Sequence, residues 1–479
     1  MFMGLVGPAA AQGLGPANPP QQFQGAPAGT PLAPPPAAYP APPGQVLPPE
    51  IGALLAKHNL NPERVSIYVQ EVGEKQPLVS LNADTPRNPA SVAKLLTTGA
   101  GISALGEQFR WKTNFYLDEL PDANGVSHGN LYIQGSGDPY LVQERLWEAL
   151  QAMRNKGLRE ITGNIVLDDG AFRLSQSEQD GGSFDGAEQS AYNAVPNALM
   201  VNFRTIDIYV GNGVRIEPNI TSWKIVNRVQ RTKGKCGRSG ISANLERAAD
   251  GSAQLVLSGR LGASCPEYHI KTVLGEGSEV FYYWFRDYWL KLGGTAHGVG
   301  QVQPIPPGKK LFHTLESVAL PEAIAMMNQH SNNVMTRHLF LTLSQRRPAT
   351  LVDSRQAVLQ ILQKMGVNTQ NMFLDNGAGL SRRARVSARQ IVQLLQALAH
   401  NYHFIQSLAV SGEVGTLKRR FRGEALQGRI HAKTGTLRNI HSLAGYLESA
   451  SNRTYLFAII VENAGRGLEN DLLRWLYNQ

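Results

Sequence analysis

The stretch "NPASVAKLLTT", residues 88–98, places Ser91 three residues before Lys94 in an otherwise apolar run. A serine hydroxyl is a weak nucleophile at neutral pH and needs a neighbouring base. Residues three apart share one face of a helix, so a helix that starts here would bring the two side chains together. Partial burial would lower the pKa of the lysine and allow it to act as that base. Taken alone, the pattern also fits an ordinary capped helix start, which is then the simpler interpretation.

A second motif lies about 240 residues further along the chain. "HSNNV", residues 330–334, contains an S-x-N arrangement. Ser331 could supply a proton-relay hydroxyl, and Asn333 an amide that holds a substrate carbonyl or Lys94. The alternative is a polar segment of a helix.

A third motif, "HAKTGTLRN" (431–439), directly precedes two predicted strands near the C-terminus. Lys433 and Thr434 could bind a carboxylate, and Gly435 would let a substrate backbone approach the strand closely. Each motif alone is common. The order S-x-x-K, S-x-N, K-T-G is a strong combined signal for a serine nucleophile with a lysine base.

These motifs and their spacing resemble those of the active-site serine penicillin-recognising enzymes. The long gap between Ser91 and Ser331 is similar to that of the class C low-molecular-mass penicillin-binding proteins, the D-alanyl-D-alanine carboxypeptidase/endopeptidase family. The resemblance covers roughly residues 47–479. Further stretches that carry it are "GSGDPYL" (135–141), "GNIVLDD" (163–169), "DNGAGLSRRARVS" (375–387) and "SGEVGTLKRRF" (411–421).

The resemblance implies an α/β (α+β) transpeptidase-like fold, an antiparallel sheet flanked by helices, with a large β-rich insertion between the first two motifs. It also implies that Ser91 attacks the carbonyl between the two terminal D-alanines of a peptidoglycan stem peptide. Lys94 would take the hydroxyl proton, and the backbone N–H groups of Ser91 and Thr436 would form the oxyanion hole. Ser331 would help to protonate the departing D-alanine, and Lys433 with Thr434 would hold the terminal carboxylate. β-Lactams would acylate Ser91 in the same way, and neither a metal nor an organic cofactor is needed.

Three further residues are assigned to substrate binding through the resemblance. In the family, an acidic residue of the insertion contacts the free amine of the stem peptide's diamino acid. Asp185 in "GGSFDGAEQSAY" is the candidate, with Asp180 as the runner-up, and a solvated Gly-rich loop is the alternative. Arg382 matches a family arginine near the pocket, although it could be one more surface cation. Arg438 stands where glutamine is known in the family, so substrate contacts there would differ.

The pattern of apolar residues indicates three regions. Residues 47–111 and 281–479 form a discontinuous peptidase domain, and 112–280 form an inserted β-rich region of two small subdomains. Within the peptidase domain a hairpin is predicted at 64–72 and 76–84 and strands at 442–449 and 453–463. Helices are predicted from residue 91, at 320–345, at 387–400 and at 468–479.

The first 46 residues predict export. "MFMGLVGPAAAQ" is typical of the end of a secretory signal, and the Pro-rich segment after it cannot form a core and would act as a mobile linker. In an exported protein, Cys236 and Cys265 would favour one disulfide, the alternative being two unpaired thiols. The localisation that follows is the periplasm of a Gram-negative bacterium, with at most peripheral membrane association, because no later run is long enough to span a membrane.

The net charge of +9 fits attraction to an anionic polymer, but also a merely solvated basic surface. No zinc-finger spacing or RNA-recognition signature supports nucleic acid as a partner. The expected partners are peptidoglycan stem peptides and β-lactams, and the oligomeric state, a dimer among others, stays open. A β-lactamase and a non-catalytic wall-binding protein of the same fold are the competing functions.

Overall fold

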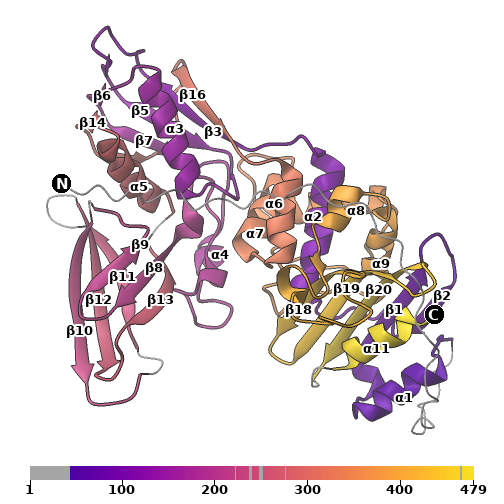
Figure 1. Ribbon diagram of the computed structural model, residues 1–479. Coiled ribbons are helices and arrows are strands. Elements are labelled where there is room, and N and C mark those ends of the chain that lie inside the picture. Colours follow the sequence, from indigo (N-terminus) through magenta and orange to yellow (C-terminus); the bar gives the residue numbers. More distant parts are fainter. Residues whose placement is uncertain (1–43, 222, 237–239, 248–251, 276, 464–466) are drawn as a thin grey trace.

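The computed structural model describes residues 44–479 except 222, 237–239, 248–251, 276 and 464–466. The predicted signal segment and nearly all of the Pro-rich linker lie outside the described residues. Figure 1 shows two bodies, one a sheet flanked by helices and the other built mainly from strands. None of the described helices is long and apolar enough to cross a membrane.

The first body is built on a six-stranded antiparallel sheet with the order β17-β18-β19-β20-β1-β2. The predicted hairpin and the two predicted C-terminal strands are confirmed, and β1 pairs with both β2 and β20. The first strand of this sheet in the sequence is therefore hydrogen-bonded to its last strand. The bounds are β1 Val65–Glu71, β2 Pro77–Leu81, β17 Ala409–Val410, β18 Ile430–Leu437, β19 Ile440–Glu448 and β20 Thr454–Glu462.

Helices cover both faces of this sheet, which is why its strands are almost continuously apolar. In β1, Tyr68 packs into the core under α2, α6, α7, α8 and α9, whereas Ile67 and Val69 point to the core under α1 and α11. This alternation follows from the two-residue period of a strand. The bounds are α1 Pro49–Lys57, α2 Ala93–Leu105, α6 Leu320–Gln329, α7 Asn333–Thr342, α8 Leu351–Lys364, α9 Ala388–Ala397, α10 Tyr402–Gln406 and α11 Leu468–Tyr477.

The stretch 320–345, predicted as helical throughout, is two helices with a break between them. α6 ends at Gln329, and α7 begins at Asn333. Between them Ser331 has φ 57°, in the left-handed region that interrupts a right-handed helix. Asn332 then caps α7 by accepting a hydrogen bond from the Met335 N–H (3.1 Å). The S-x-N motif is thus a turn and a helix start rather than a helix interior.

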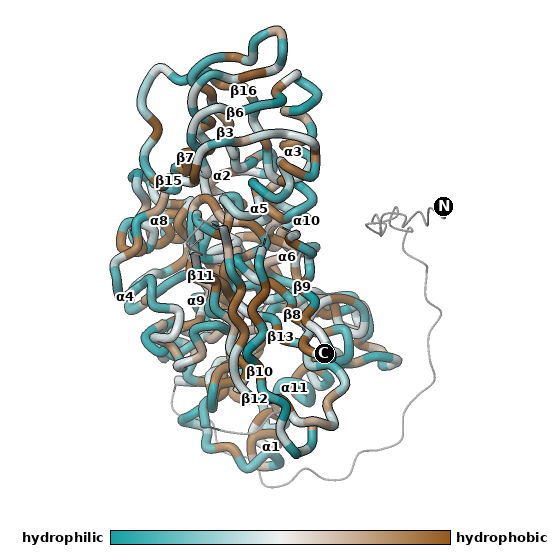
Figure 2. Tube along the Cα trace, turned by 90° about the vertical axis from the view of Figure 1, so that its left-hand side faces the viewer, coloured by the Kyte–Doolittle hydropathy of each residue, from teal (hydrophilic) through white to brown (hydrophobic). Residues whose placement is uncertain are grey.

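The second body contains four small sheets over one continuous apolar core, with α3 and α5 packed against it. Figure 2 shows hydrophobic stretches running along strands in its lower part. The sheet orders are β15-β7-β5-β3-β16, β14-β6-β4, β13-β8-β9 and β10-β12-β11. The bounds are β3 Lys112–Leu117, β4 Val126–Ser127, β5 Leu131–Gly135, α3 Gln143–Asn155, β6 Glu160–Ile161, β7 Ile165–Asp168, α4 Gln176–Gln179, β8 Thr205–Val210, β9 Val214–Glu217, β10 Lys224–Thr232, β11 Ser242–Arg247, β12 Ala253–Gly262, β13 Tyr268–Val273, α5 Gly277–Lys291, β14 Thr295–Ala296, β15 Gly300–Val302 and β16 Lys310–Glu316.

The strands at 295–316 belong with the inserted region, although the sequence placed everything after 281 in the peptidase domain. β14 pairs with β6, β15 with β7 and β16 with β3, and all three partner strands lie in the predicted insertion. The chain returns beside its point of departure, where Trp111 and Ser317 exchange two hydrogen bonds of 2.9 Å. Residues 295–316 therefore lie beside strands of the predicted insertion.

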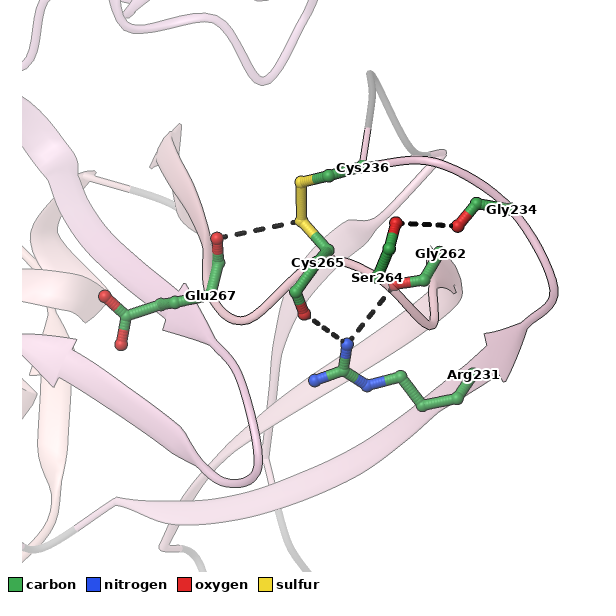
Figure 3. Close-up of a disulfide and its surroundings, with 7 residues drawn as sticks. All are labelled: Arg231, Gly234, Cys236, Gly262, Ser264, Cys265 and Glu267. Atoms are coloured by element: carbon green, nitrogen blue, oxygen red, sulfur yellow. Dashed lines mark hydrogen bonds between the residues drawn. A yellow bond between two sulfur atoms is a disulfide. The ribbon is translucent and has the colours of Figure 1, made fainter.

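Cys236 and Cys265 form a disulfide, as the export argument predicts (Figure 3). It joins the turn after β10 to the turn between β12 and β13. Arg231 donates to the Cys265 carbonyl (2.7 Å) and the Ser264 hydroxyl donates to the Gly234 carbonyl (2.9 Å), so hydrogen bonds reinforce the same corner. The bond closes a loop with a sequence separation of 29 residues.

Candidate active site

Ser91 lies in a single 3-10 turn, Ala90–Val92, that leads directly into α2. Lys94 follows in the first turn of α2 and is fully buried. Its Nζ lies 3.0 Å from the Ser91 Oγ, which is hydrogen-bonding distance. The predicted helix start is therefore correct, and it brings the two side chains together.

Two further oxygens fix the Lys94 amine. Nζ donates to the Asn333 Oδ1 (2.7 Å) and to the Ala378 carbonyl (2.5 Å). Burial is the main reason why the pKa of Lys94 lies well below its ordinary value, and the positive charge of Lys433 lowers it further. The amine is thus held beside the serine under conditions that favour its neutral form.

Lys433 lies on β18 and is also fully buried. Its Nζ donates to the Ser331 Oγ (2.9 Å) and to the Thr434 carbonyl (2.8 Å). Burial lowers the pKa of Lys433 to about 7. The turn between α6 and α7 places Ser331 beside β18, so the second and third motifs are in direct contact.

Two glycines let the backbone around Ser91 pack closely. At Gly379, which has φ 78°, an added Cβ would lie 1.8 Å from the Ala90 carbonyl oxygen. At Gly435 an added Cβ would lie 2.1 Å from the Ser442 Oγ and 2.9 Å from the Pro89 carbonyl oxygen. Gly435 was predicted to admit a substrate backbone. The contacts show that the absence of a side chain at Gly435 leaves room for the protein's own turn before Ser91.

Ser91 opens into a cleft of about 650 Å³, and the predicted residues Lys94, Lys433, Thr434 and Gly435 lie behind its lining rather than in it. Of the predicted residues, Ser91, Ser331 and Asn333 line it from the catalytic side. The other predicted residues that line it are Asp185, Arg382, Thr436 and Arg438, joined by Phe184, Tyr192, Gly379, Leu380 and Leu437. The structure therefore brings together segments from the peptidase domain and from the insertion.

The insertion contributes the loop that contains Asp185. Its carboxylate accepts hydrogen bonds from the Tyr192 hydroxyl (2.6 Å), the Asn193 amide (2.8 Å) and the Ala187 N–H (3.0 Å). The bond from Tyr192 is the main reason why the pKa of Asp185 is lowered. The runner-up, Asp180, does not line this cleft but a neighbouring pocket. Asp185 is thus a fixed anion at the wall of the cleft.

Arg382 reaches across to the same loop. It donates to the Phe184 carbonyl (3.3 Å), and its guanidinium lies 5.1 Å from the centre of the Phe184 ring. Thr434 lies on the strand beside the cleft, where its hydroxyl donates to the Thr416 Oγ1 (2.9 Å).

Three contacts involve groups to which the sequence assigned no role. The Ala378 carbonyl holds Lys94, the Tyr192 carbonyl accepts from the Asn333 amide (3.0 Å), and Thr416 binds Thr434. The first two are backbone groups, which any residue type supplies. Among the described residues, no group of three or more His, Cys, Asp or Glu side chains comes together that could hold a metal ion.

A buried lysine beside a serine at a helix start, next to a K-T-G strand of a helix-flanked antiparallel sheet, defines an active-site serine penicillin-recognising enzyme. The chain belongs to the D-Ala-D-Ala carboxypeptidase 3 (S13) family, whose model matches residues 47–478. The predicted family, fold class and serine-type D-Ala-D-Ala carboxypeptidase activity are thereby confirmed.

Individual relatives are distant in sequence. The D-alanyl-D-alanine carboxypeptidase DacB of Haemophilus influenzae is 23% identical over 415 residues, which are 84% of this chain and 86% of the relative. A D-alanyl-D-alanine carboxypeptidase of Actinomadura sp. strain R39 is 25% identical over 430 residues, 83% of this chain and 78% of the relative. The crystal structure of penicillin binding protein 4 (dacB) from Haemophilus influenzae superposes with a TM-score of 0.77 at 23% identity, covering 90% of this chain and 99% of that one. That protein has also been solved in complex with a β-lactam.

Proposed function

We propose that the enzyme hydrolyses the terminal D-Ala-D-Ala bond of peptidoglycan stem peptides, and D-Ala-diamino acid cross-links, through an acyl-enzyme on Ser91. The observation that carries this proposal is the set of contacts around Lys94. A neutral amine has two N–H donors and one lone pair. Asn333 and Ala378 supply the two acceptors, which leaves the lone pair directed to the Ser91 hydroxyl.

The first chemical step then follows from this arrangement. Lys94 takes the Ser91 proton as the Oγ–C bond forms at the D-alanine carbonyl. The negative charge on the carbonyl oxygen would be met by the backbone N–H groups of Ser91 and Thr436. When the C–N bond breaks, the departing amine needs a proton. Ser331, hydrogen-bonded to Lys433, can relay it, and water later releases the acyl group.

Substrate binding uses both sides of the cleft. On the strand side, Lys433 and Thr434 would hold the terminal carboxylate of the substrate. On the insertion side, Asp185 would pair with the amine of the diamino acid, and its place in the cleft supports it over Asp180. Arg382 and Arg438 line the same wall and would contact the rest of that residue.

β-Lactams would acylate Ser91 because their ring carbonyl occupies the position of the scissile carbonyl. The disulfide and the cell-wall enzyme family are consistent with export. We place the enzyme in the periplasm of a Gram-negative bacterium, where its substrate lies.

A labelling experiment with fluorescent penicillin tests the nucleophile. The wild type should be labelled, Ser91→Ala should not, and Ser451→Ala, a matched change on the surface turn before β20, should behave like the wild type. Labelling of Ser91→Ala would remove Ser91 from its role.

Mass analysis of monomeric and cross-linked muropeptides after incubation tests the reaction. Release of D-alanine and of separated strands supports both activities. A protein that binds muropeptides without products, or that turns over penicillin rapidly, would instead be a binding protein or a β-lactamase.

A further inference from the structure

A second pocket, of about 340 Å³, lies beside the catalytic cleft. Phe184, Leu380 and Arg382 line both spaces, so this wall separates them. The pocket is bounded by α4 and the loop after it on one side and by the 375–383 loop on the other. A peptide seated in the cleft therefore has this pocket directly next to it.

Arg337 is part of the lining of this second pocket. It lies on α7 four residues after Asn333, so it is on the same face of the helix as that active-site amide. Only 8% of Arg337 is exposed. Its guanidinium makes one hydrogen bond to the described residues, from Nη1 to the Ala194 carbonyl at 3.3 Å, and its buried Nε has no acceptor.

The carboxylates that line the pocket form hydrogen bonds with groups other than Arg337. Asp375 accepts from Arg383 (2.5 Å) and from the Ser381 hydroxyl (2.7 Å). Glu178 accepts from the Ser175 N–H (2.8 Å) in the cap of α4. The third carboxylate in the lining, Asp180, accepts from the Gly182 N–H (2.8 Å). None of the three forms an ion pair with Arg337 within 4 Å, and Glu178 and Asp375 lie close enough to influence its charge.

The guanidinium stays charged in this setting. Burial lowers the pKa of Arg337 to about 10, and Glu178 and Asp375 act in the opposite direction. A buried cation with unused donors costs free energy unless an acceptor reaches it. A planar carboxylate is the acceptor that matches the fork of an arginine.

We propose that Arg337 and the pocket above it bind a carboxylate of the muropeptide other than the terminal one held at Lys433 and Thr434. The proposal rests on the proposed function, since it extends the same substrate into the neighbouring pocket. Arg382 also lines the pocket and adds positive charge beside Arg337, whereas Arg383 is paired with Asp375. The carboxylate can come from the strand being cleaved or from the strand cross-linked to it.

Steady-state kinetics on matched peptides test this site. The substrates are a stem peptide with free internal carboxylates, the same peptide amidated at those positions, and the cross-linked dimer of the free form. Arg337→Gln should lower kcat/KM for the free peptide or for the dimer roughly ten- to a hundredfold, the value of a charge-assisted hydrogen bond, and leave the amidated peptide unchanged. A loss confined to the dimer assigns the carboxylate to the neighbouring strand.

Two other variants and one independent readout accompany this measurement. Arg385→Gln removes an exposed charge two residues after the 375–383 loop, outside the pocket lining, and should change none of the three rates. Ser177→Tyr narrows the pocket from its exposed rim while Arg337 itself stays in place, and it should reproduce the selective loss even if Arg337→Gln fails to fold. Equal losses on free and amidated peptides would overturn the carboxylate site. Penicillin labelling reports Ser91 separately, so a protein that is labelled, but whose rates on the free peptide and on the dimer are both unchanged by Arg337→Gln, refutes this inference alone.

Discussion

Replacing Gly379 by alanine should disable the nucleophile with little loss of fold. The added Cβ would lie 1.8 Å from the Ala90 carbonyl oxygen, whereas ordinary contact begins at 3.4 Å. One of the two backbones must therefore move by about 1.6 Å, because neither contact atom belongs to a flexible side chain. The residue after Ala90 is Ser91, and the residue before Gly379 supplies the carbonyl that holds Lys94. Either movement separates the serine from its base.

The size of the effect follows from the geometry. A displacement of about 1 Å in a catalytic group costs on the order of a hundredfold in rate, so acylation by fluorescent penicillin should slow by at least that factor. Alanine at a positive φ also destabilises the fold by about 1–2 kcal/mol. Gly366→Ala is the matched control, since Gly366 has φ 84° and nothing within 4 Å of an added Cβ. It should show the stability loss in urea unfolding with an unchanged acylation rate.

The acylation rates of these two variants test whether the contact between Gly379 and Ala90 positions Ser91. If Gly379→Ala is acylated as fast as the wild type, the contact with Ala90 does not position Ser91. If Gly366→Ala is slowed equally, the effect comes from general destabilisation, and the reasoning from the local contact fails.

The remaining predictions concern the disulfide and three buried bases. Replacing Cys236 and Cys265 together by serine should lower the free energy of unfolding by roughly 3–4 kcal/mol, because a closed loop of this length restricts the unfolded chain; unchanged urea unfolding would contradict this. Acylation should increase with pH as Lys94 loses its proton, and Lys433→Gln should move that rise to higher pH, since it removes a charge that lowers the pKa of Lys94; a rise at lower pH would have the wrong sign. His338 is buried with its pKa lowered to about 4, so the unfolded chain binds its proton first, and stability should fall as the pH drops from about 6.5 towards 4. His338→Asn should flatten that part of the stability–pH curve, and an unaltered curve would assign it to other groups.

The sequence predicted the parts of the site that depend on side-chain type and local spacing. Ser91 and Lys94 are one helical turn apart, so their meeting follows from helix geometry alone. The contact of Ser331 with Lys433 was not predicted, since nothing in the spacing of residues 102 apart specifies a contact.

Other features could not be predicted because they depend on backbone groups and on long-range pairing. The carbonyls of Ala378 and Tyr192 give no sequence signal, since every residue has one. The break at Ser331 was hidden by apolar residues that continue with a helical period on both sides. The Asn332 cap was the signal that could have revealed it. Strands 295–316 were assigned to the peptidase domain because periodicity predicts a strand but not its partner.

The pairing of β1 with β20 has a consequence for the time at which the enzyme becomes active. Residues 65–71 lack one neighbouring strand until residues 454–462 have been synthesised, and Lys94 and Ser91 face an incomplete site until residue 433 emerges. At about 5–20 residues/s, this interval lasts on the order of 20–70 s. A partly made chain therefore carries its nucleophile without the strand that completes the pocket. The active site is therefore complete only after residues more than 300 positions beyond the nucleophile have joined the fold, so any truncation before residue 433 leaves Ser91 and Lys94 without Lys433.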